Sequence, residues 1–121
     1  MTGPTDVQQY DKLTVKVFRS KEELGLAAAQ HAQALVNEIM ETKASVNLLF
    51  STGASQFTFV NALAECGLPW NQIHAFHLDE YLGMEEEHPA SFRLWLKERI
   101  ERRYHPASFS YIQGDAADGR E

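Results

Sequence analysis

The sequence has little of what secreted, membrane-spanning and nucleic-acid-binding proteins need. Its one cysteine, Cys66, cannot form an internal disulfide, which is typical of a protein from a reducing compartment. Apolar runs stay well below the roughly 20 residues that span a bilayer, and residues 1–12 lack the basic start and apolar core of a signal peptide. The 11 Lys and Arg residues are outnumbered by 17 Asp and Glu residues, which disfavours a nucleic-acid partner. We therefore expect a cytoplasmic protein that binds neither membranes nor nucleic acid.

Chain length and hydrophobic content are those of a single folded domain. The 121 residues are 44% hydrophobic, which is enough for a buried core. Residues 1–12 are polar and include Gly3 and Pro4, so we predict a disordered tail there. The domain is then expected to occupy residues 13–121.

The first part of the domain has the pattern of a strand followed by a long helix. Apolar and polar residues alternate over residues 13–18, which predicts a strand. Ser20 lies three residues before Glu23, the spacing of a helix-capping box, and helical periodicity follows. The predicted apolar stripe of this helix comprises Leu24, Ala27, Ala28, His31, Leu35 and Ile39. We interpret His31 as a core or helix-contact residue and not as a ligand, because it has no acidic or histidine partner one helical turn away.

Strand and helix patterns alternate through the rest of the chain. Strands are predicted at residues 45–50, 72–78 and 109–115, and helices at residues 57–66 and 90–104. This order is typical of a parallel sheet with helices on both faces. The chain stops directly after the last predicted strand, without a helix to cover the next face, so we expect the fold to be incomplete.

A short loop of small residues follows the predicted strand 45–50, at the sheet edge where open α/β proteins bind ligands. The loop consists of Ser51, Thr52, Gly53, Ala54 and Ser55. Backbone N–H groups and hydroxyls in such a turn, together with the positive end of the helix dipole, favour an anion, and we expect phosphate. A purely structural alternative is that Ser55 caps the helix and Gly53 relieves a tight turn. The loop matches neither a Walker loop nor a G-x-G-x-x-G turn.

Two adjacent carboxylates, Asp79 and Glu80, follow the predicted strand 72–78. A carboxylate near a phosphate anchor is suited to removing a proton from a carbon next to a carbonyl, because burial or a neighbouring carboxylate can raise its pKa into the working range. The acidic run 85–87 is expected to be a solvated loop surface. His77 and Asp79 lie two residues apart, on one strand face, but without another nearby His or Cys we do not expect a metal site.

These two loops carry a resemblance to a known family. The sequence FHLDEYLGMEEEHPASF, residues 76–92, and the preceding LLFSTGASQFTFVNAL resemble the amino-terminal half of glucosamine-6-phosphate deaminases and isomerases, and the similarity spans residues 13–115. The resemblance implies a Rossmann-like α/β fold. It also implies conversion of glucosamine 6-phosphate, or a related aminosugar phosphate, to fructose 6-phosphate and ammonia, without metal or organic cofactor. Such an enzyme of amino-sugar catabolism moves a proton between C1 and C2 of the opened sugar.

The resemblance also assigns roles to residues of the two loops. It implies that Asp79 is the general base, and we group Glu80 with it as a second catalytic candidate. It places Ser51, Thr52, Gly53, Ala54 and Ser55 around the sugar and its phosphate. Tyr81, Gly83 and His88 match the family motif and are expected to shape the site, although His88 would equally suit a structural loop residue.

Two departures from the family pattern limit what this chain is expected to do alone. The family usually has a second glycine and a proline where this chain has Ala54 and Gln56, so we expect either the loop shape or the substrate to differ. The family's ring-opening histidine and further phosphate-binding basic residues belong to a carboxyl-terminal half that lies outside this sequence. We therefore predict that the 121 residues are inactive alone and need that half or a companion polypeptide.

Two alternative functions stay open at this point. A 6-phosphogluconolactonase, a hydrolase of related fold, typically has an arginine after its Asp-Glu pair, where this chain has Tyr81. A sugar-phosphate sensor would bind its ligand without chemistry and would not need a base at Asp79. A homo-oligomer is compatible with each of the three functions.

Overall fold

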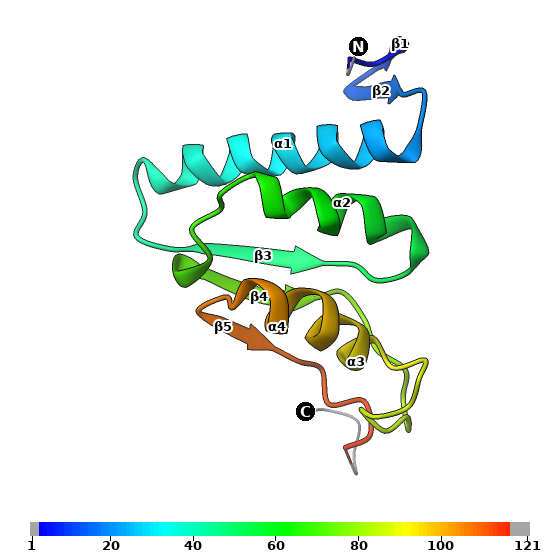
Figure 1. Ribbon diagram of the computed structural model, residues 1–121, viewed down its shortest axis with the longest axis vertical. Coiled ribbons are helices and arrows are strands. Elements are labelled where there is room, and N and C mark those ends of the chain that lie inside the picture. The colour runs from blue at the N-terminus through cyan, green and yellow to red at the C-terminus, as the bar shows by residue number, and fades with distance from the viewer. Residues whose placement is uncertain (1–2, 117–121) are drawn as a thin grey trace.

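The structure of the chain, a computed structural model, describes residues 3–116 as a separate hairpin, a parallel sheet and helices (Figure 1). The strands are β1 (Asp6–Tyr10), β2 (Leu13–Val17), β3 (Val46–Phe50), β4 (Ile73–His77) and β5 (Ser108–Ser110). The helices are α1 (Lys21–Met40), α2 (Phe57–Ala62), α3 (Phe92–Leu96) and α4 (Arg102–Tyr104), and the π-helical segment Lys97–Glu101 joins α3 to α4. Within these residues no helix combines the length and the hydrophobicity needed to cross a membrane.

Strands β3, β4 and β5 form one parallel sheet in sequence order. Val46 pairs with Ile73 and Phe50 pairs with His77, while β5 lies on the other side of β4. The predicted α/β fold class is confirmed, because β3–α2–β4 and β4–α3–β5 are two consecutive parallel crossover units. All three strands run in the same direction, so their carboxyl ends lie at one edge of the sheet.

Residues 6–17 form an antiparallel hairpin that is not part of the parallel sheet (Figure 1). The predicted strand 13–18 is present as β2, but it pairs with β1 instead of entering the sheet. The prediction of a disordered tail over residues 1–12 is therefore wrong for β1. The physical reason lies at Asp11, whose φ of 54° allows a two-residue turn, so that the polar strand β1 can satisfy backbone groups of β2.

The long helix α1 begins as predicted but buries a different face. The Ser20 side chain accepts a hydrogen bond from an N–H of the first turn, which confirms the predicted N-cap. Gly25, Ala29 and Val36 are buried, because α1 packs against α2 through small side chains that allow the helices to approach closely. The exposed members of the predicted stripe include Leu24, His31, Leu35 and Ile39. His31 is exposed, so of the two interpretations given for it the one as a core residue is wrong.

Gly25 lies where α1 and α2 are in close contact. A Cβ atom at this position would come within 2.5 Å of the backbone carbon and the Cβ of Thr58. Replacing a glycine inside a helix by alanine ordinarily stabilises the helix by about 0.5–1 kcal/mol. We expect the opposite sign for Gly25→Ala, a loss of about 1–3 kcal/mol in the free energy of unfolding, because the helices must move apart. Urea denaturation measures this change, with Gln30→Ala on the exposed side of α1 as the control. A Gly25→Ala chain as stable as the wild type would contradict the close contact.

One face of the parallel sheet is covered and the other is open in the described part of the chain. Val46 and Ile73 are buried in the core, on the face that the helices cover. On the opposite face Leu49 is 64% exposed and Phe76 is 38% exposed. Of the helices predicted for both faces, residues 3–116 provide those of one. A parallel sheet is ordinarily buried on both faces, and here the described residues cover one of them.

Candidate functional site

The two predicted site loops begin side by side at the carboxyl edge of the sheet. Phe50 and His77 pair at the ends of β3 and β4, and the Leu78 N–H donates a hydrogen bond to the Phe50 carbonyl at 3.0 Å. Phe50 and His77 are both buried, which fixes the two strand ends in the core. The loop 51–55 therefore starts next to the loop that carries Asp79 (Figure 1).

The loop 51–55 turns sharply at Gly53. The φ of 108° and ψ of 170° at this residue are accessible almost only to glycine. The Gln56 N–H then donates to the Gly53 carbonyl at 3.0 Å, which begins a 3₁₀ turn that leads into α2. Ser55 does not cap α2, because no side chain accepts a hydrogen bond from a backbone N–H at the start of this helix; the Ser55 hydroxyl instead accepts one from the side-chain amide of Gln56, at 3.3 Å. The tight turn at Gly53 is thus confirmed, and the cap at Ser55 is wrong. Ala54 and Ser55 are exposed, and Ser51 and Thr52 are half-buried.

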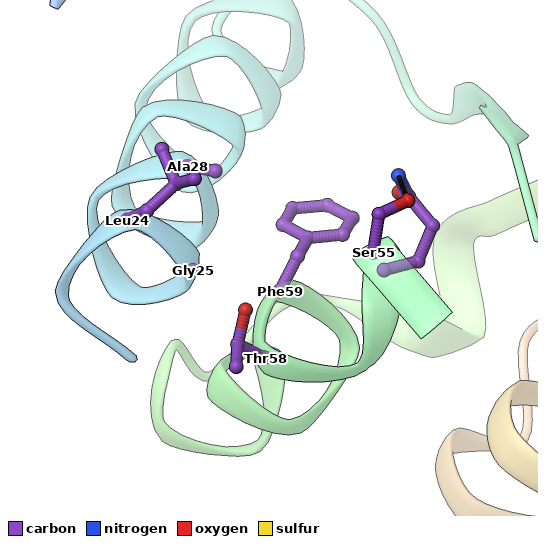
Figure 2. A pocket seen from close by; sticks show the side chains of 7 residues that line it. Leu24, Gly25, Ala28, Ser55, Thr58 and Phe59 are labelled. Carbon is purple, nitrogen blue, oxygen red and sulfur yellow. Dashed lines mark hydrogen bonds between the residues drawn. The ribbon is translucent and has the colours of Figure 1, made fainter. Parts of the chain in front are cut away.

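A shallow pocket lies behind this loop, between α1 and α2. It is lined by Leu24, Gly25, Ala28, Ser55, Gln56, Thr58 and Phe59. Figure 2 shows Leu24 and Ala28 on α1 and Phe59 on α2 around this space. The lining is mainly apolar and does not include Asp79. We therefore interpret the pocket as packing space between two helices, and place the candidate site at the carboxyl edge instead.

Asp79 presents its carboxylate to solvent at this edge. The residue is exposed, and among residues 3–116 its side chain takes part in no hydrogen bond or ion pair. Its main chain is held, because the Asp79 carbonyl oxygen lies 2.8 Å from Nδ1 of His77. The carboxylate of the predicted base is therefore attached to a fixed backbone and is available to a ligand.

The carboxylate of Glu80, in contrast, is fully hydrogen-bonded within the fold. Its buried carboxylate accepts hydrogen bonds at 2.9–3.1 Å from the backbone N–H groups of Tyr81, Phe92 and Arg93, the Ser91 hydroxyl and Nε of Arg93. Burial alone would raise the pKa of Glu80, but these donors outweigh it and hold the pKa below its ordinary value. Both carboxylate oxygens are occupied, so the grouping of Glu80 with Asp79 as a catalytic candidate does not fit this geometry. Glu80 attaches the loop to the start of α3.

Arg93 is a site residue that the sequence analysis missed. Its almost fully buried guanidinium donates hydrogen bonds at 2.9–3.1 Å to Glu80, the Met84 carbonyl, Gln113 and Asp115. Burial would lower the pKa of Arg93, but the bonds to Glu80 and Asp115 outweigh it and raise the pKa. One side chain thereby connects the loop after β4 to the segment after β5. A single arginine in a predicted helix gave no signal of this role, because Asp115 lies 22 residues away in sequence.

The other motif residues shape the loop between β4 and α3. The Tyr81 ring packs on the aromatic ring at the start of α3, with 4.8 Å between the centroids. Gly83 adopts a φ of 73°, and its N–H donates to the Gly114 carbonyl at 2.7 Å. His88 accepts a hydrogen bond at 3.0 Å from the backbone two residues further on, which supports the structural interpretation of this residue. The loop is thus held by its own residues and by the segment after β5.

His77 uses both ring nitrogens within the fold. Nδ1 lies 2.8 Å from the Asp79 carbonyl oxygen, and Nε2 lies 2.8 Å from the Ile112 backbone nitrogen. A metal pair of His77 and Asp79 therefore lacks a free nitrogen ligand. Across residues 3–116 there is also no group of three His, Cys, Asp or Glu side chains that could hold a metal ion.

The buried His77 is expected to make stability depend on pH. Burial lowers the pKa of His77 from its ordinary value of about 6.5, although the Asp79 carbonyl and the charges of Glu80 and Asp79 oppose this. At a pH between the two pKa values the unfolded chain binds a proton that the folded chain does not. The contribution of His77 to the free energy of unfolding is therefore fully present above about pH 6.5 and is lost as the pH falls below it. Urea titrations at several pH values should show this fall, and a smaller one for His77→Gln. Equal slopes in the two proteins would contradict the assignment to His77.

Comparisons with known proteins agree with the two motif loops. The chain is 30% identical over 112 residues to a curated glucosamine-6-phosphate deaminase from Arthrobacter sp. (strain FB24), covering 88% of this chain and 42% of that protein. It is 27% identical over 89 residues to glucosamine-6-phosphate deaminase 1 from Giardia intestinalis, covering 69% of this chain and 34% of that protein. The chain thus spans less than half the length of these curated relatives. No protein-family model matches it.

Solved structures share the fold of this chain. A monomeric glucosamine-6-phosphate deaminase of the NagB superfamily matches with a TM-score of 0.65 at 23% identity, over 82% of this chain and 42% of that chain. A 6-phosphogluconolactonase from Shewanella baltica OS155 matches with a TM-score of 0.71 at 19% identity, over 78% of this chain and 41% of that chain. Both enzymes therefore contain the α/β arrangement described here. By sequence, the chain is related to the glucosamine-6-phosphate deaminase/isomerase family that its two motif loops indicated.

Proposed function

We propose that this chain supplies the base and part of the phosphate site of a cytoplasmic enzyme that converts glucosamine 6-phosphate, or a related aminosugar phosphate, to fructose 6-phosphate and ammonia. The observation that carries this proposal is the pairing of Phe50 with His77, because it brings the loop 51–55 and Asp79 to one edge of the sheet. The names of the curated relatives support the choice of substrate. Because those relatives are more than twice as long as the part they share with this chain, the proposal concerns a larger protein.

The proposed chemistry assigns one task to each loop. Backbone N–H groups and hydroxyls of the loop 51–55 bind the phosphate and so place the sugar. The Asp79 carboxylate removes the proton from C2 of the ring-opened aldehyde and returns it to C1. Water then hydrolyses the C=N bond left at C2, so that one water enters and one ammonia leaves. Asp79 suits this task because its carboxylate is exposed on a fixed backbone, whereas the carboxylate of Glu80 is occupied by donors.

We further propose that residues 1–121 do not complete the reaction alone. The open sheet face with Leu49 and Phe76 would be covered by additional polypeptide, either in the same chain or in a companion. That polypeptide would bring the ring-opening histidine and the basic residues that complete phosphate binding. Ammonia release from glucosamine 6-phosphate by the 121-residue chain, above an Asp79→Asn control, would contradict this part of the proposal.

A lactonase of the 6-phosphogluconolactonase type is the second candidate, and the fold match favours it. This chain differs from the lactonase pattern at Tyr81, where a lactonase would be expected to carry an arginine. The Tyr81 side chain packs on Phe92 and offers no positive charge to an anionic substrate. The deaminase is therefore the function that the site supports better.

The test uses the larger protein of this proposal, in which residues 1–121 are joined by the additional polypeptide; we call it the complete protein. It is assayed with glucosamine 6-phosphate and, separately, with 6-phosphogluconolactone. We expect ammonia and fructose 6-phosphate from the first assay and no hydrolysis above background in the second. Hydrolysis of the lactone alone would replace the proposal by the hydrolase. Thermal protection by glucosamine 6-phosphate without turnover, equal in the wild type and in Asp79→Asn, would replace it by a sugar-phosphate sensor.

A further inference from the structure

We propose that His77 is a positioning residue for Asp79: as a neutral imidazole with its proton on Nδ1, it bridges the loop after β4 to the segment after β5 and so fixes the backbone from which the Asp79 carboxylate projects. This inference rests on the proposed function of Asp79 as the base. The bridge itself is a structural feature that can be measured whether or not that function is correct.

The two partners of the ring determine where its proton lies. The atom facing Nδ1 is the Asp79 carbonyl oxygen, which can only accept a hydrogen bond, so Nδ1 must carry the proton. The group facing Nε2 is the Ile112 N–H, which can only donate, so Nε2 must present its lone pair. Both contacts are 2.8 Å long. One neutral tautomer satisfies both partners, and the other tautomer satisfies neither.

The surroundings of His77 hold the ring in this orientation. The residue is 5% exposed, and its ring lies 6.4 Å from the ring of Phe109 and 5.7 Å from that of Tyr111, between centroids. The charged groups nearest to it are Asp79 and Glu80 on its own loop and Arg93 from α3, while the Tyr111 phenol faces it from the segment after β5. A rotated ring would leave two backbone groups without partners in a buried environment, which is costly.

A second contact makes the two segments behave as one unit. The Gly83 N–H donates to the Gly114 carbonyl at 2.7 Å, and a Cβ atom at Gly114 would lie only 2.2 Å from the Tyr81 carbonyl oxygen. The loop on either side of Asp79 is therefore attached to the segment after β5. Protonation of Nε2 would place a hydrogen against the Ile112 N–H and break the bridge, so the position of Asp79 is expected to depend on the neutral state of His77.

The first test reads the tautomer directly in the 121-residue chain. With ¹⁵N-labelled histidine, we expect a protonated Nδ1 and an unprotonated Nε2 for His77 at pH 7.5, about one unit above the ordinary histidine pKa, together with slow hydrogen exchange at the Ile112 N–H. On acidification the Nε2 signal and the Ile112 amide signal should change together. A proton on Nε2 at neutral pH, or an Ile112 amide that exchanges freely, would overturn the proposal.

The second test asks whether the bridge serves Asp79. His77→Gln keeps one donor and one acceptor, whereas His77→Leu keeps similar bulk and loses both. In the complete protein we expect kcat for glucosamine 6-phosphate to fall about 10²-fold in His77→Leu, because small displacements of a reacting group are that costly, with KM changed little. His77→Gln should recover part of this loss. Equal kcat values in the wild type and in a folded His77→Leu variant would overturn the positioning role.

A third readout separates this inference from the proposed function. If the wild-type complete protein does not turn over the aminosugar phosphate, the proposed function is rejected. The Asp79 NMR signals of the 121-residue chain then decide whether the His77 bridge positions Asp79. These signals should move in His77→Leu and stay close to the wild type in His77→Gln. If His77→Leu does not fold, His77→Gln is compared with His77→Ala. Asp79 signals that are the same in all the folded variants would contradict the role of His77.

Discussion

Replacing Asp79 by asparagine in the complete protein is expected to lower kcat for glucosamine 6-phosphate by about 10²–10⁴-fold, the range typical of losing a general base. The amide has nearly the same shape as the carboxylate but cannot take the proton from C2. Asp79 is exposed, and its side chain has no partner among residues 3–116, so the free energy of unfolding should change by less than about 0.5 kcal/mol. A coupled assay of ammonia release measures the first quantity, and urea denaturation measures the second.

Glu85→Gln is the matched control for Asp79→Asn. Glu85 is another exposed carboxylate, six positions further along the same loop, and the substitution removes the same charge. We expect Glu85→Gln to keep nearly full activity. An Asp79→Asn enzyme with the activity of the Glu85→Gln enzyme would show that Asp79 is not the base, whatever its place in the motif.

Replacing Arg93 by methionine is expected to cost about 3–5 kcal/mol in the free energy of unfolding, because it leaves a buried carboxylate without its ionic partner. The Arg93 and Glu80 side chains are 2% and 0% exposed, and their charged atoms are 3.1 Å apart. The same substitution also removes the hydrogen bonds to Gln113 and Asp115, and so separates the loop after β4 from the segment after β5. Urea denaturation of the 121-residue chain measures the loss.

Lys97→Met is the matched control for Arg93→Met. Lys97 forms an ion pair with Glu86 at 2.7 Å, but these side chains are 26% and 30% exposed. Ion pairs that reach solvent contribute about 0–1 kcal/mol, so the loss in Lys97→Met should be within that range. If Arg93→Met were no more destabilising than Lys97→Met, the buried network would not be what holds the site loop.

The sequence predicted the parts of the fold that depend on local patterns. The cap of α1 was predicted from the spacing between Ser20 and Glu23, and the strands β3 and β4 were predicted from short apolar runs. Two other features depend on which segment packs or pairs with which, and were not predictable in the same way. Strand β2 pairs with β1, since a turn at Asp11 allows a local partner. Helix α1 buries Gly25 in place of Leu24, because close approach to α2 is possible only along small residues.

The candidate site shows the same division. The order of strands and loops was enough to predict that Asp79 and the loop 51–55 lie at one edge, because parallel strands end together. The roles of Glu80 and Arg93 were not predictable, because their partners come from α3 and from the segment after β5. A carboxylate that the fold occupies and one that it leaves exposed look alike in the sequence. Only their contacts distinguish Glu80, which attaches the loop to α3, from Asp79, the proposed base.

The most direct test of the central claim is an NMR titration of the ¹⁵N-labelled 121-residue chain with glucosamine 6-phosphate, and in parallel with glucosamine and with inorganic phosphate. If the carboxyl edge is the site, the sugar phosphate should shift amide signals of the loop 51–55 and of the residues around Asp79, and phosphate alone should shift mainly the loop 51–55. Glucosamine alone should have little effect. Shifts confined to the pocket between α1 and α2, or no shift at either loop, would contradict the claim that the two loops form one aminosugar-phosphate site.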